Sequence, residues 1–229
     1  MRSPFPVART LRTIYKKLYA AFGPQHWWPG DTPFEVAIGA ILTQNTAWAN
    51  AAKAISRLKQ ERMLDPVRLS TLPKQRLATL VRSSGYFNQK AQRLKIFVGY
   101  LLEKQRGKIG RMRGLSLNSA RRELLELSGI GPETADSILL YALEKPTFVI
   151  DAYTRRILAR HSLISWDATY EEIRSLFLKH LPPKSSLFNE YHALLVALGK
   201  ELCRTHPRCH LCPLQKIGRL RLETTPARI

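Results

Sequence analysis

Residues 127–135 read Leu-Ser-Gly-Ile-Gly-Pro-Glu-Thr-Ala, and this stretch determines the expected fold. Glycines on both sides of Ile130 permit a tight turn and a close approach of another molecule, and Pro132 suits the first position of a helix. Apolar residues recur at helical spacing on either side, so the stretch predicts a hairpin between two packed helices. Its backbone would bind an anionic oxygen. The alternative is an ordinary helix–helix loop whose glycines only close the turn.

The charge of the chain favours an anionic partner. It contains 37 Lys and Arg against 17 Asp and Glu, a net charge of +20 with a pI near 10.4. Such an excess, spread along the whole chain, indicates binding to an anionic polymer, because each neutralised phosphate releases condensed counterions. A membrane surface is the rival partner. The most apolar run, residues 34–42, contains Glu35 and is too short to span a bilayer, and no signal-peptide pattern opens the chain, so we expect no membrane partner.

Helical periodicity dominates the 229 residues, and strand-like alternation is almost absent. We therefore predict an all-α fold, and the length allows two modest domains. The predicted helices are roughly Val7 to Phe22, Pro33 to Leu42, Ala47 to Leu58, Pro73 to Arg82, Gln89 to Lys104, Ser119 to Leu127, Pro132 to Leu143, Ala152 to His161, Tyr170 to His180 and Leu187 to Cys203.

Four separated motifs carry a family resemblance. They are Phe34-Glu35 running into residues 41–46 (Ile-Leu-Thr-Gln-Asn-Thr), residues 85–91 (Gly-Tyr-Phe-Asn-Gln-Lys-Ala), the hairpin, and residues 149–151 (Val-Ile-Asp). In order and spacing they resemble the endonuclease III branch of the helix-hairpin-helix DNA glycosylases, over about residues 27 to 214.

The resemblance implies two helical domains with an active site in the cleft between them. A six-helix barrel would span residues 29–144 and contain the hairpin, whose Gly129, Ile130, Gly131 and Thr134 would bind the DNA backbone. Residues 1–28 and 145–229 would form a second helical domain with a C-terminal Cys loop. Glycosylases of this kind flip a damaged nucleotide out of the duplex, because the glycosidic bond is inaccessible inside the base stack.

Asp151 is the predicted catalytic residue. It directly precedes a predicted helix, so a helix N-cap is its ordinary structural role, and the two roles are compatible. As the base departs, C1′ of the sugar gains oxocarbenium character, and a fixed carboxylate stabilises that charge or orients water onto it. In the family that the chain resembles, the matching Asp is catalytic.

Glu133 departs from the pattern of glycosylases that also cut the DNA backbone. These enzymes carry at this position a Lys whose amine attacks C1′ to form a Schiff base. A carboxylate does not form that imine, and a helix-start acid favoured by the macrodipole is the ordinary role of Glu133. The resemblance therefore implies a monofunctional glycosylase that uses water and leaves an abasic site. Lys200 is a possible cleft lysine, which leaves weak lyase activity open.

Aromatic residues bear on the substrate. Trp27, Trp28 and Pro29 precede the first barrel helix and Trp48 follows Gln44, so these residues are candidates for the base pocket, with a core role as the alternative. An N-alkylated purine such as 3-methyladenine is cationic and is attracted by electron-rich rings. The Trp-Trp-Pro run, residues 42–46 followed by Trp48, and Glu133 together resemble the 3-methyladenine DNA glycosylase subgroup.

Gln44 lies where the family inserts a polar side chain into the gap left by the flipped base. A polar residue at a helix end, without a ligand, is the alternative interpretation of Gln44.

The three cysteines of the chain, Cys203, Cys209 and Cys212, resemble the C-terminal iron–sulfur loop of the family as candidate metal ligands. That loop carries four Cys, whereas Gly218 occupies the expected fourth position here. A [4Fe-4S] cluster needs four thiolates, so the fourth ligand is unknown, with His206, His210 or water as candidates. Zinc held by three Cys and one His, or a loop without metal, are the alternatives.

Taken together, these patterns predict a base-excision glycosylase without β-lyase activity that acts on double-stranded DNA containing a damaged base. An endonuclease III-like glycosylase and AP lyase for oxidised pyrimidines is the alternative enzyme. A non-catalytic DNA-binding module is the alternative from another class. By analogy with glycosylases we expect a monomer, in the cytoplasm and associated with the nucleoid.

Overall fold

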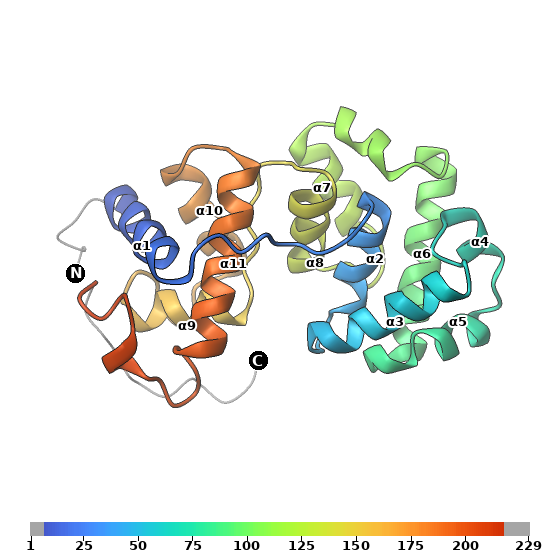
Figure 1. Cartoon of the computed structure of the whole chain (residues 1–229). Coiled ribbons are helices and arrows are strands. Elements are labelled where there is room, and N and C mark those ends of the chain that lie inside the picture. The colour runs from blue at the N-terminus through green and yellow to red at the C-terminus, as the bar shows by residue number, and fades with distance from the viewer. Residues whose placement is uncertain (1–6, 218–229) are drawn as a thin grey trace. The chain divides into compact units, whose positions relative to one another are not determined.

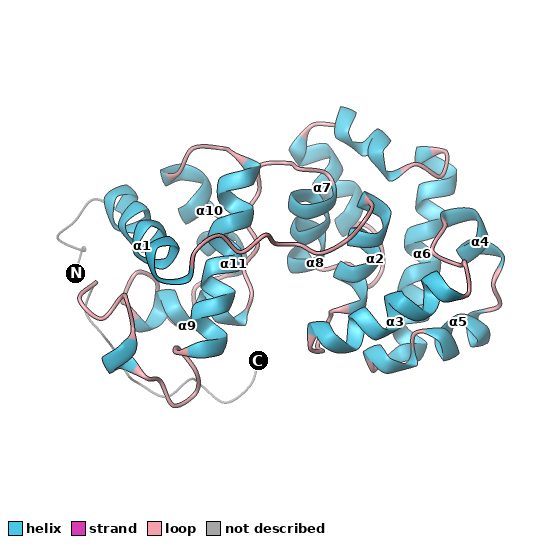
Figure 2. Cartoon of the chain, viewed as in Figure 1, coloured by secondary structure: helices cyan, strands magenta, loops and turns pink. Residues whose placement is uncertain are grey.

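Helices make up the regular structure of the protein. The structure is a computed structural model that describes residues 7–217, and within this range the chain forms helices and loops without a strand (Figures 1 and 2). The predicted all-α fold is confirmed. No helix in the described part of the chain is long and apolar enough to cross a membrane.

The chain divides into two compact units. One comprises residues 28–145 and the other joins the two ends of the chain, up to residue 27 and from residue 146 onward. The helices of the internal unit are α2 (Pro33–Leu42), α3 (Trp48–Gln60), α4 (Pro66–Thr71), α5 (Lys74–Leu80), η1 (Arg82–Ser84), α6 (Phe87–Gln105), η2 (Ile109–Gly114), α7 (Leu117–Leu125), α8 (Pro132–Ser137) and the π-helical turn η3 (Ile138–Ala142). The helices of the terminal unit are α1 (Val7–Phe22), α9 (Ala152–Arg160), α10 (Tyr170–His180), α11 (Ser185–Glu201) and η4 (Cys209–Leu211).

Helix α2 is the central helix of the internal unit. Its sequence is apolar on all sides apart from Glu35, which is typical of a helix buried on every face. Thr32 caps its first turn by accepting a hydrogen bond from the amide of Glu35, and Pro33 follows at the first helical position. Lys59 Nζ lies 2.6 Å from Glu35 Oε1, so this buried charge is paired. Helix α2 packs against α3, α6, α8 and η3, and its end delivers the segment that contains Gln44.

The end of α2 is held by a buried lysine on α6. The Lys90 side chain has no exposed surface, and its Nζ donates to the carbonyl of Leu42 at 2.8 Å and to that of Ser84 at 2.6 Å. Burial, followed by the nearby positive charge of Arg93, lowers the pKa of Lys90 from 10.5 to about 8. Lys90 therefore satisfies two carbonyls that helix ends leave without a partner and fixes the start of the loop after α2.

Aromatic packing forms the centre of the terminal unit. Phe148 stacks on Phe177 with ring centroids 3.6 Å apart, and the buried Tyr191 hydroxyl donates to the Leu11 carbonyl, which joins α11 to α1. A Cβ on Gly199 would lie 2.5 Å from Cδ1 of Tyr153, so glycine here permits α11 to pack tightly against the start of α9. This packing sets the relative position of the first residues of α9 and the last turn of α11.

Besides short 3-10 turns and shifted helix ends, the structure differs from the predicted helices in two places. The single helix expected from Pro132 to Leu143 is instead α8 followed by a π-helical turn, in which the Leu143 amide donates to the Ile138 carbonyl. Helix α4, capped by Asp65, lies in a stretch where no helix was predicted, because its six residues are too few to show a period.

Candidate active site

The predicted hairpin connects α7 to α8. Gly129 has a positive φ of 86°, and the Ile130 amide donates to the Leu127 carbonyl at 3.0 Å, which closes the turn. Ile130 itself is only 4% exposed and anchors the turn in the core. Gly131 has an ordinary φ of −87°, and a Cβ added to it would meet nothing within 4 Å. Intramolecular packing therefore accounts for the glycine at 129 but leaves the glycine at 131 unexplained.

Gln44 lies against this hairpin. Its Nε2 donates to the Gly129 carbonyl at 3.0 Å and to the hydroxyl of the buried Thr134 at 2.8 Å. Its Oε1 accepts a hydrogen bond from the Arg93 guanidinium. The structure thus brings together two residues that the sequence assigned to different roles, Gln44 as a base-gap residue and Thr134 as part of the hairpin, and adds Arg93.

Asp151 is the N-cap of α9. Its Oδ1 accepts a hydrogen bond from the Thr154 amide at 2.7 Å, and its backbone is extended, as is usual at an N-cap. Its Oδ2 lies 3.6 Å from Nε2 of His192 on α11. The Asp151 side chain is 14% exposed and that of His192 is 5% exposed, so one carboxylate oxygen is used structurally while the other faces a nearly buried imidazole.

Electrostatics keep Asp151 ionised. Burial alone would raise its pKa, but the attraction of His192 and the hydrogen bond of the Thr154 amide outweigh that effect and lower the pKa below the usual value. A carboxylate in this setting is negatively charged at neutral pH and fixed in orientation. Such a group can stabilise a developing cation on a sugar ring or orient a water molecule.

The tryptophans predicted to line the base pocket lie in two different units of the chain and have different partners. Trp28 packs edge-on against Trp48 with ring centroids 5.0 Å apart and stacks on Tyr141 at 4.9 Å, all within the internal unit. Trp27 belongs to the terminal unit, where Lys200 Nζ lies 5.6 Å from its ring centroid. Trp28 and Trp48 are partly exposed and Pro29 is exposed. The π-helical turn η3 supplies Tyr141 to the Trp28 and Trp48 pair.

Three lysines that bear on lyase chemistry, Lys90, Lys145 and Lys200, have contacts within the protein. Lys90 and Lys145 are both nearly buried and donate to backbone carbonyls, Lys145 to those of Arg113 and Leu115. Lys200 is exposed in the last turn of α11, beside Trp27. Glu133, at the position of the lyase amine, is exposed in the first turn of α8.

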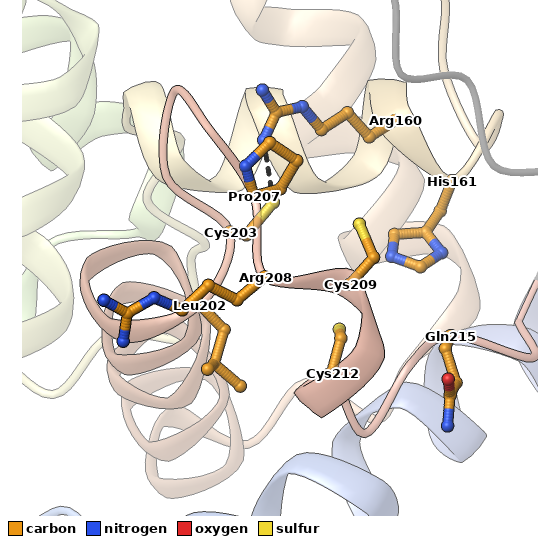
Figure 3. Close-up of a pocket in the computed structure, with 9 residues that line it drawn as sticks. All are labelled: Arg160, His161, Leu202, Cys203, Pro207, Arg208, Cys209, Cys212 and Gln215. Carbon is orange, nitrogen blue, oxygen red and sulfur yellow. Dashed lines mark hydrogen bonds between the residues drawn. The ribbon is translucent and has the colours of Figure 1, made fainter.

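The three cysteines surround one pocket near the C-terminal end of the described chain. Figure 3 shows the side chains of Cys203, Cys209 and Cys212 in this pocket together with those of Arg160 and His161. Protein contacts hold the loop. Arg160 Nη1 donates to Cys203 Sγ at 3.4 Å and to the carbonyl of residue 204 at 2.6 Å, and Arg156 Nε donates to the Cys203 carbonyl at 2.8 Å.

The resemblance implies a [4Fe-4S] cluster at this loop, which requires four thiolate ligands. The whole chain has three cysteines, and Gly218 at the expected fourth position lies outside the described residues. His206 and His210, the candidate fourth ligands, are exposed and do not line the pocket. Between residues 7 and 217, no group of three or more His, Cys, Asp or Glu side chains is placed to hold a metal ion. The residues present therefore do not fit a four-thiolate cluster.

Sequence reasoning missed three side chains that contact the predicted residues: His192 beside Asp151, Arg93 beside Gln44, and Tyr141 beside Trp28. A lone His in an otherwise apolar helix and an Arg on the amphipathic α6 carry no distinctive local signal. Tyr141 lies three residues into a stretch that has the appearance of a plain buried helix. Each of these residues becomes notable only through the partner that the fold places beside it.

Comparisons with known proteins identify the family of the chain. Residues 38–183 match the family described as HhH-GPD superfamily base excision DNA repair protein. A protein of Methanocaldococcus jannaschii with the provisional name DNA repair glycosylase MJ1434 is 43% identical over 205 residues, which cover 89% of this chain and 93% of that protein. Endonuclease III of Thermotoga maritima is 30% identical over 184 residues, covering 80% of this chain and 81% of that protein.

Solved structures show the same fold. The structure of a trapped endonuclease III–DNA covalent intermediate has a TM-score of 0.82 at 24% identity, covering 97% of each chain. The H. pylori 3-methyladenine DNA glycosylase bound to 1,N6-ethenoadenine has a TM-score of 0.74 at 26% identity, covering 86% of this chain and 98% of that one.

Proposed function

Since the chain belongs to the HhH-GPD superfamily of base excision DNA repair proteins, we propose that it is a monofunctional DNA glycosylase that removes an alkylated purine from duplex DNA. The base is released by hydrolysis and an abasic site remains. The observation that carries this proposal is the Asp151 carboxylate, which is held by Thr154 through one oxygen and faces His192 with the other.

In the proposed reaction, the bond between C1′ and the purine nitrogen breaks and the electron pair leaves with the base. C1′ becomes positively charged, and Asp151 stabilises that charge electrostatically. A water molecule then adds to C1′ and loses a proton, so that the products are the free base and an abasic sugar. An N-alkylated purine is a good leaving group because it already carries positive charge, which is compatible with a site that offers a single carboxylate.

DNA binding is supported by charge and by the hairpin. The net charge of +20 favours a polyphosphate partner, and the exposed Gly131 leaves room for a close approach to the backbone. The amides of Gly129 and Gly131 donate no hydrogen bond to other described residues, so both are available to phosphate oxygens.

The absence of lyase chemistry is inferred from the amines of the site. A lyase step needs an amine that attacks C1′, and Glu133 does not supply one. Lys90 and Lys145 are bound to backbone carbonyls, and Lys200 lies against Trp27. These contacts support a water-dependent reaction over a Schiff base.

The preference for an alkylated purine is inferred from Trp28, Trp48 and Tyr141. The Trp28 ring centroid lies 5.0 Å from that of Trp48 and 4.9 Å from that of Tyr141, and electron-rich rings attract a cationic base. The likeness to a 3-methyladenine DNA glycosylase in complex with a modified adenine points the same way.

The test is incubation of the protein with duplexes that each carry one lesion, followed by identification of the released base and of any strand cleavage. We expect free 3-methyladenine, intact strands and no adduct after borohydride treatment. Release of thymine glycol with strand cleavage, or an imine-trapped adduct, would overturn the proposal in favour of a glycosylase and AP lyase.

A matched pair of variants tests Asp151. Asp151→Asn should lower the rate of base release by about 100-fold or more, because electrostatic stabilisation of the transition state is lost. Duplex binding should persist. Asp65→Asn changes a second helix N-cap, on α4, in the same way and should leave base release unchanged. Unchanged release by Asp151→Asn would remove Asp151 from the reaction, whereas duplex binding without any base release by the wild-type protein would indicate a non-catalytic DNA-binding module.

A further inference from the structure

Three hydrogen bonds hold the Gln44 side chain to the protein. Its amide donates to the Gly129 carbonyl and the Thr134 hydroxyl, and its carbonyl oxygen accepts from Arg93. Both ends of the Gln44 amide are thus occupied, so the side chain must break these contacts before it can enter a DNA duplex. The free protein holds its base-gap residue in a docked state.

Arg93 also covers the hairpin. A Cβ on Gly129 would lie 2.5 Å from Cγ and 2.7 Å from Nε of Arg93, so the Arg93 side chain runs directly over the glycine. The same turn presents the amide groups of Gly129 and Gly131, which donate to no other residue in the described part of the chain. The Arg93 guanidinium therefore lies beside the place where a DNA phosphate would meet the hairpin.

In the free protein the Arg93 guanidinium binds a weak acceptor, the Gln44 amide oxygen. Arg93 is partly exposed and forms no ion pair with an acidic group between residues 7 and 217. Its charged donors instead meet the neutral amide oxygen of Gln44. A phosphate is a stronger acceptor, because it carries charge and matches the planar fork of a guanidinium.

We propose that Arg93 transfers its hydrogen bond from Gln44 to a DNA phosphate at the hairpin, and thereby releases Gln44 for insertion into the duplex. Arg93 is then a positioning residue in the free protein and a phosphate ligand in the complex. Backbone binding and base-gap insertion become coupled, because one guanidinium serves one partner at a time. This inference rests on the proposed DNA glycosylase function.

The first measurement is the salt dependence of binding to an undamaged duplex. Arg93→Met keeps an unbranched side chain over Gly129 but removes the charge. The loss of one phosphate contact should make the slope of log affinity against log salt shallower by about 0.9. Between about 50 and 200 mM salt, the affinity of the variant should therefore fall by a factor about threefold smaller than the affinity of the wild type. Arg93→Lys, which retains the charge, should keep the slope. An unchanged slope in Arg93→Met would overturn the phosphate contact.

The second measurement follows Gln44 itself. The side-chain amide signals of Gln44 in ¹⁵N NMR spectra are identified by their loss in Gln44→Ala. In the wild-type protein they should shift when undamaged duplex is added; in Arg93→Met they should already be shifted in the free protein and change little further. Lys104→Gln removes a charge from an exposed position of the same helix and should leave the Gln44 signals as in the wild type.

The two measurements separate this inference from the function on which it rests. If the wild-type protein binds duplex and releases the base while its Gln44 signals stay unchanged, the transfer is wrong and the glycosylase function stands. If the wild-type protein binds no duplex, the proposed function fails and this inference fails with it.

Discussion

His192 Nε2 lies 3.6 Å from Asp151 Oδ2, across the contact between α11 and α9. The other oxygen of Asp151 caps α9. The carboxylate is therefore held from two sides, by a backbone amide of its own helix and by an imidazole from a helix some 40 residues later in the chain. The lowered pKa of Asp151 follows from these two partners, which offset its burial.

Substitution of His192 should change the pH dependence of base release. His192→Gln removes the imidazole whose attraction lowers the pKa of Asp151, so that pKa should rise. The rate needs the ionised carboxylate, and its acidic limb should therefore move to higher pH than in the wild type. Single-turnover rates across the acidic range measure this shift. His180→Gln, an exposed histidine at the end of α10, is the control, and an acidic limb that His192→Gln leaves in place would contradict the expectation.

Asp151 should also contribute to stability in a pH-dependent way. Its pKa is lower in the folded protein than in the unfolded chain, so its ionised form stabilises the fold above the ordinary Asp pKa of about 3.9. That contribution is lost as the pH falls through the lowered pKa of the folded state. Asp151→Asn should therefore be less stable than the wild type at neutral pH, with a difference that shrinks at low pH. Urea denaturation of the two proteins at neutral and at low pH measures this difference in the free energy of unfolding. A difference that is the same at both pH values would argue against the lowered pKa.

The two hairpin glycines should respond differently to alanine. Gly129→Ala introduces a Cβ into a left-handed residue against Arg93 and should cost about 1–2 kcal/mol or more of folding free energy. Gly131→Ala meets no atom and has ordinary torsion angles, so its folding free energy should change by less than about 0.5 kcal/mol. Gly131→Ala should nevertheless weaken duplex binding, because the new methyl group faces the phosphate. Urea denaturation and fluorescence anisotropy measure the two effects; wild-type affinity in Gly131→Ala would remove the hairpin from the DNA interface.

Lys90 should make the free energy of unfolding depend on pH in the alkaline range. Its pKa is about 8 in the folded protein, below the ordinary value of 10.5, so between these values the unfolded chain binds more protons than the folded one. Folding stability from this group therefore rises with pH through that window. The neutral amine keeps two N–H groups for the Leu42 and Ser84 carbonyls.

Lys90→Met provides the comparison for this signal. It should be destabilised by about 1–3 kcal/mol for each carbonyl left without a partner and should lack the alkaline rise. Lys53→Met, at an exposed position of α3, is the control. Parallel stability curves for the wild type and Lys90→Met between about pH 8 and 10.5 would contradict the lowered pKa.

Trp28 should matter for a cationic base more than for a neutral one. Trp28→Ala removes the stacked partner of Tyr141, and a lost cation–π contact of about 0.5–2 kcal/mol corresponds to about a 2- to 30-fold loss. We expect release of 3-methyladenine to fall by that factor relative to release of uncharged 1,N6-ethenoadenine. Trp28→Phe should restore part of the difference, and Trp27→Ala, in the other unit, should change the ratio less. Equal losses for both bases would indicate a purely structural role for Trp28.

Much of the fold was predictable from local sequence. Helices such as α1 and α2 follow from apolar periodicity and from caps such as Thr32-Pro33, which act within one or two turns of the chain. Helix boundaries differ from the prediction where a cap was overlooked: Ser116 caps α7, which begins at Leu117, two residues before the predicted start at Ser119. The π-helical turn was not predictable, because its hydrogen-bond pattern depends on packing against α2 more than on its own residues.

Local chemistry was sufficient for the all-α class, the hairpin turn and the N-cap at Asp151, because each depends on torsion angles and hydrogen bonds between near neighbours in the chain. The tertiary structure decided which side chains those elements meet: His192 for Asp151, Arg93 for Gln44 and Gly129, and Tyr141 for Trp28. These pairs join residues from separate segments of the chain, and the distance between them is set by the packing of whole helices, which no local pattern encodes. The same reason separates the neighbours Trp27 and Trp28 into different units, although their sequence suggested a single aromatic pair.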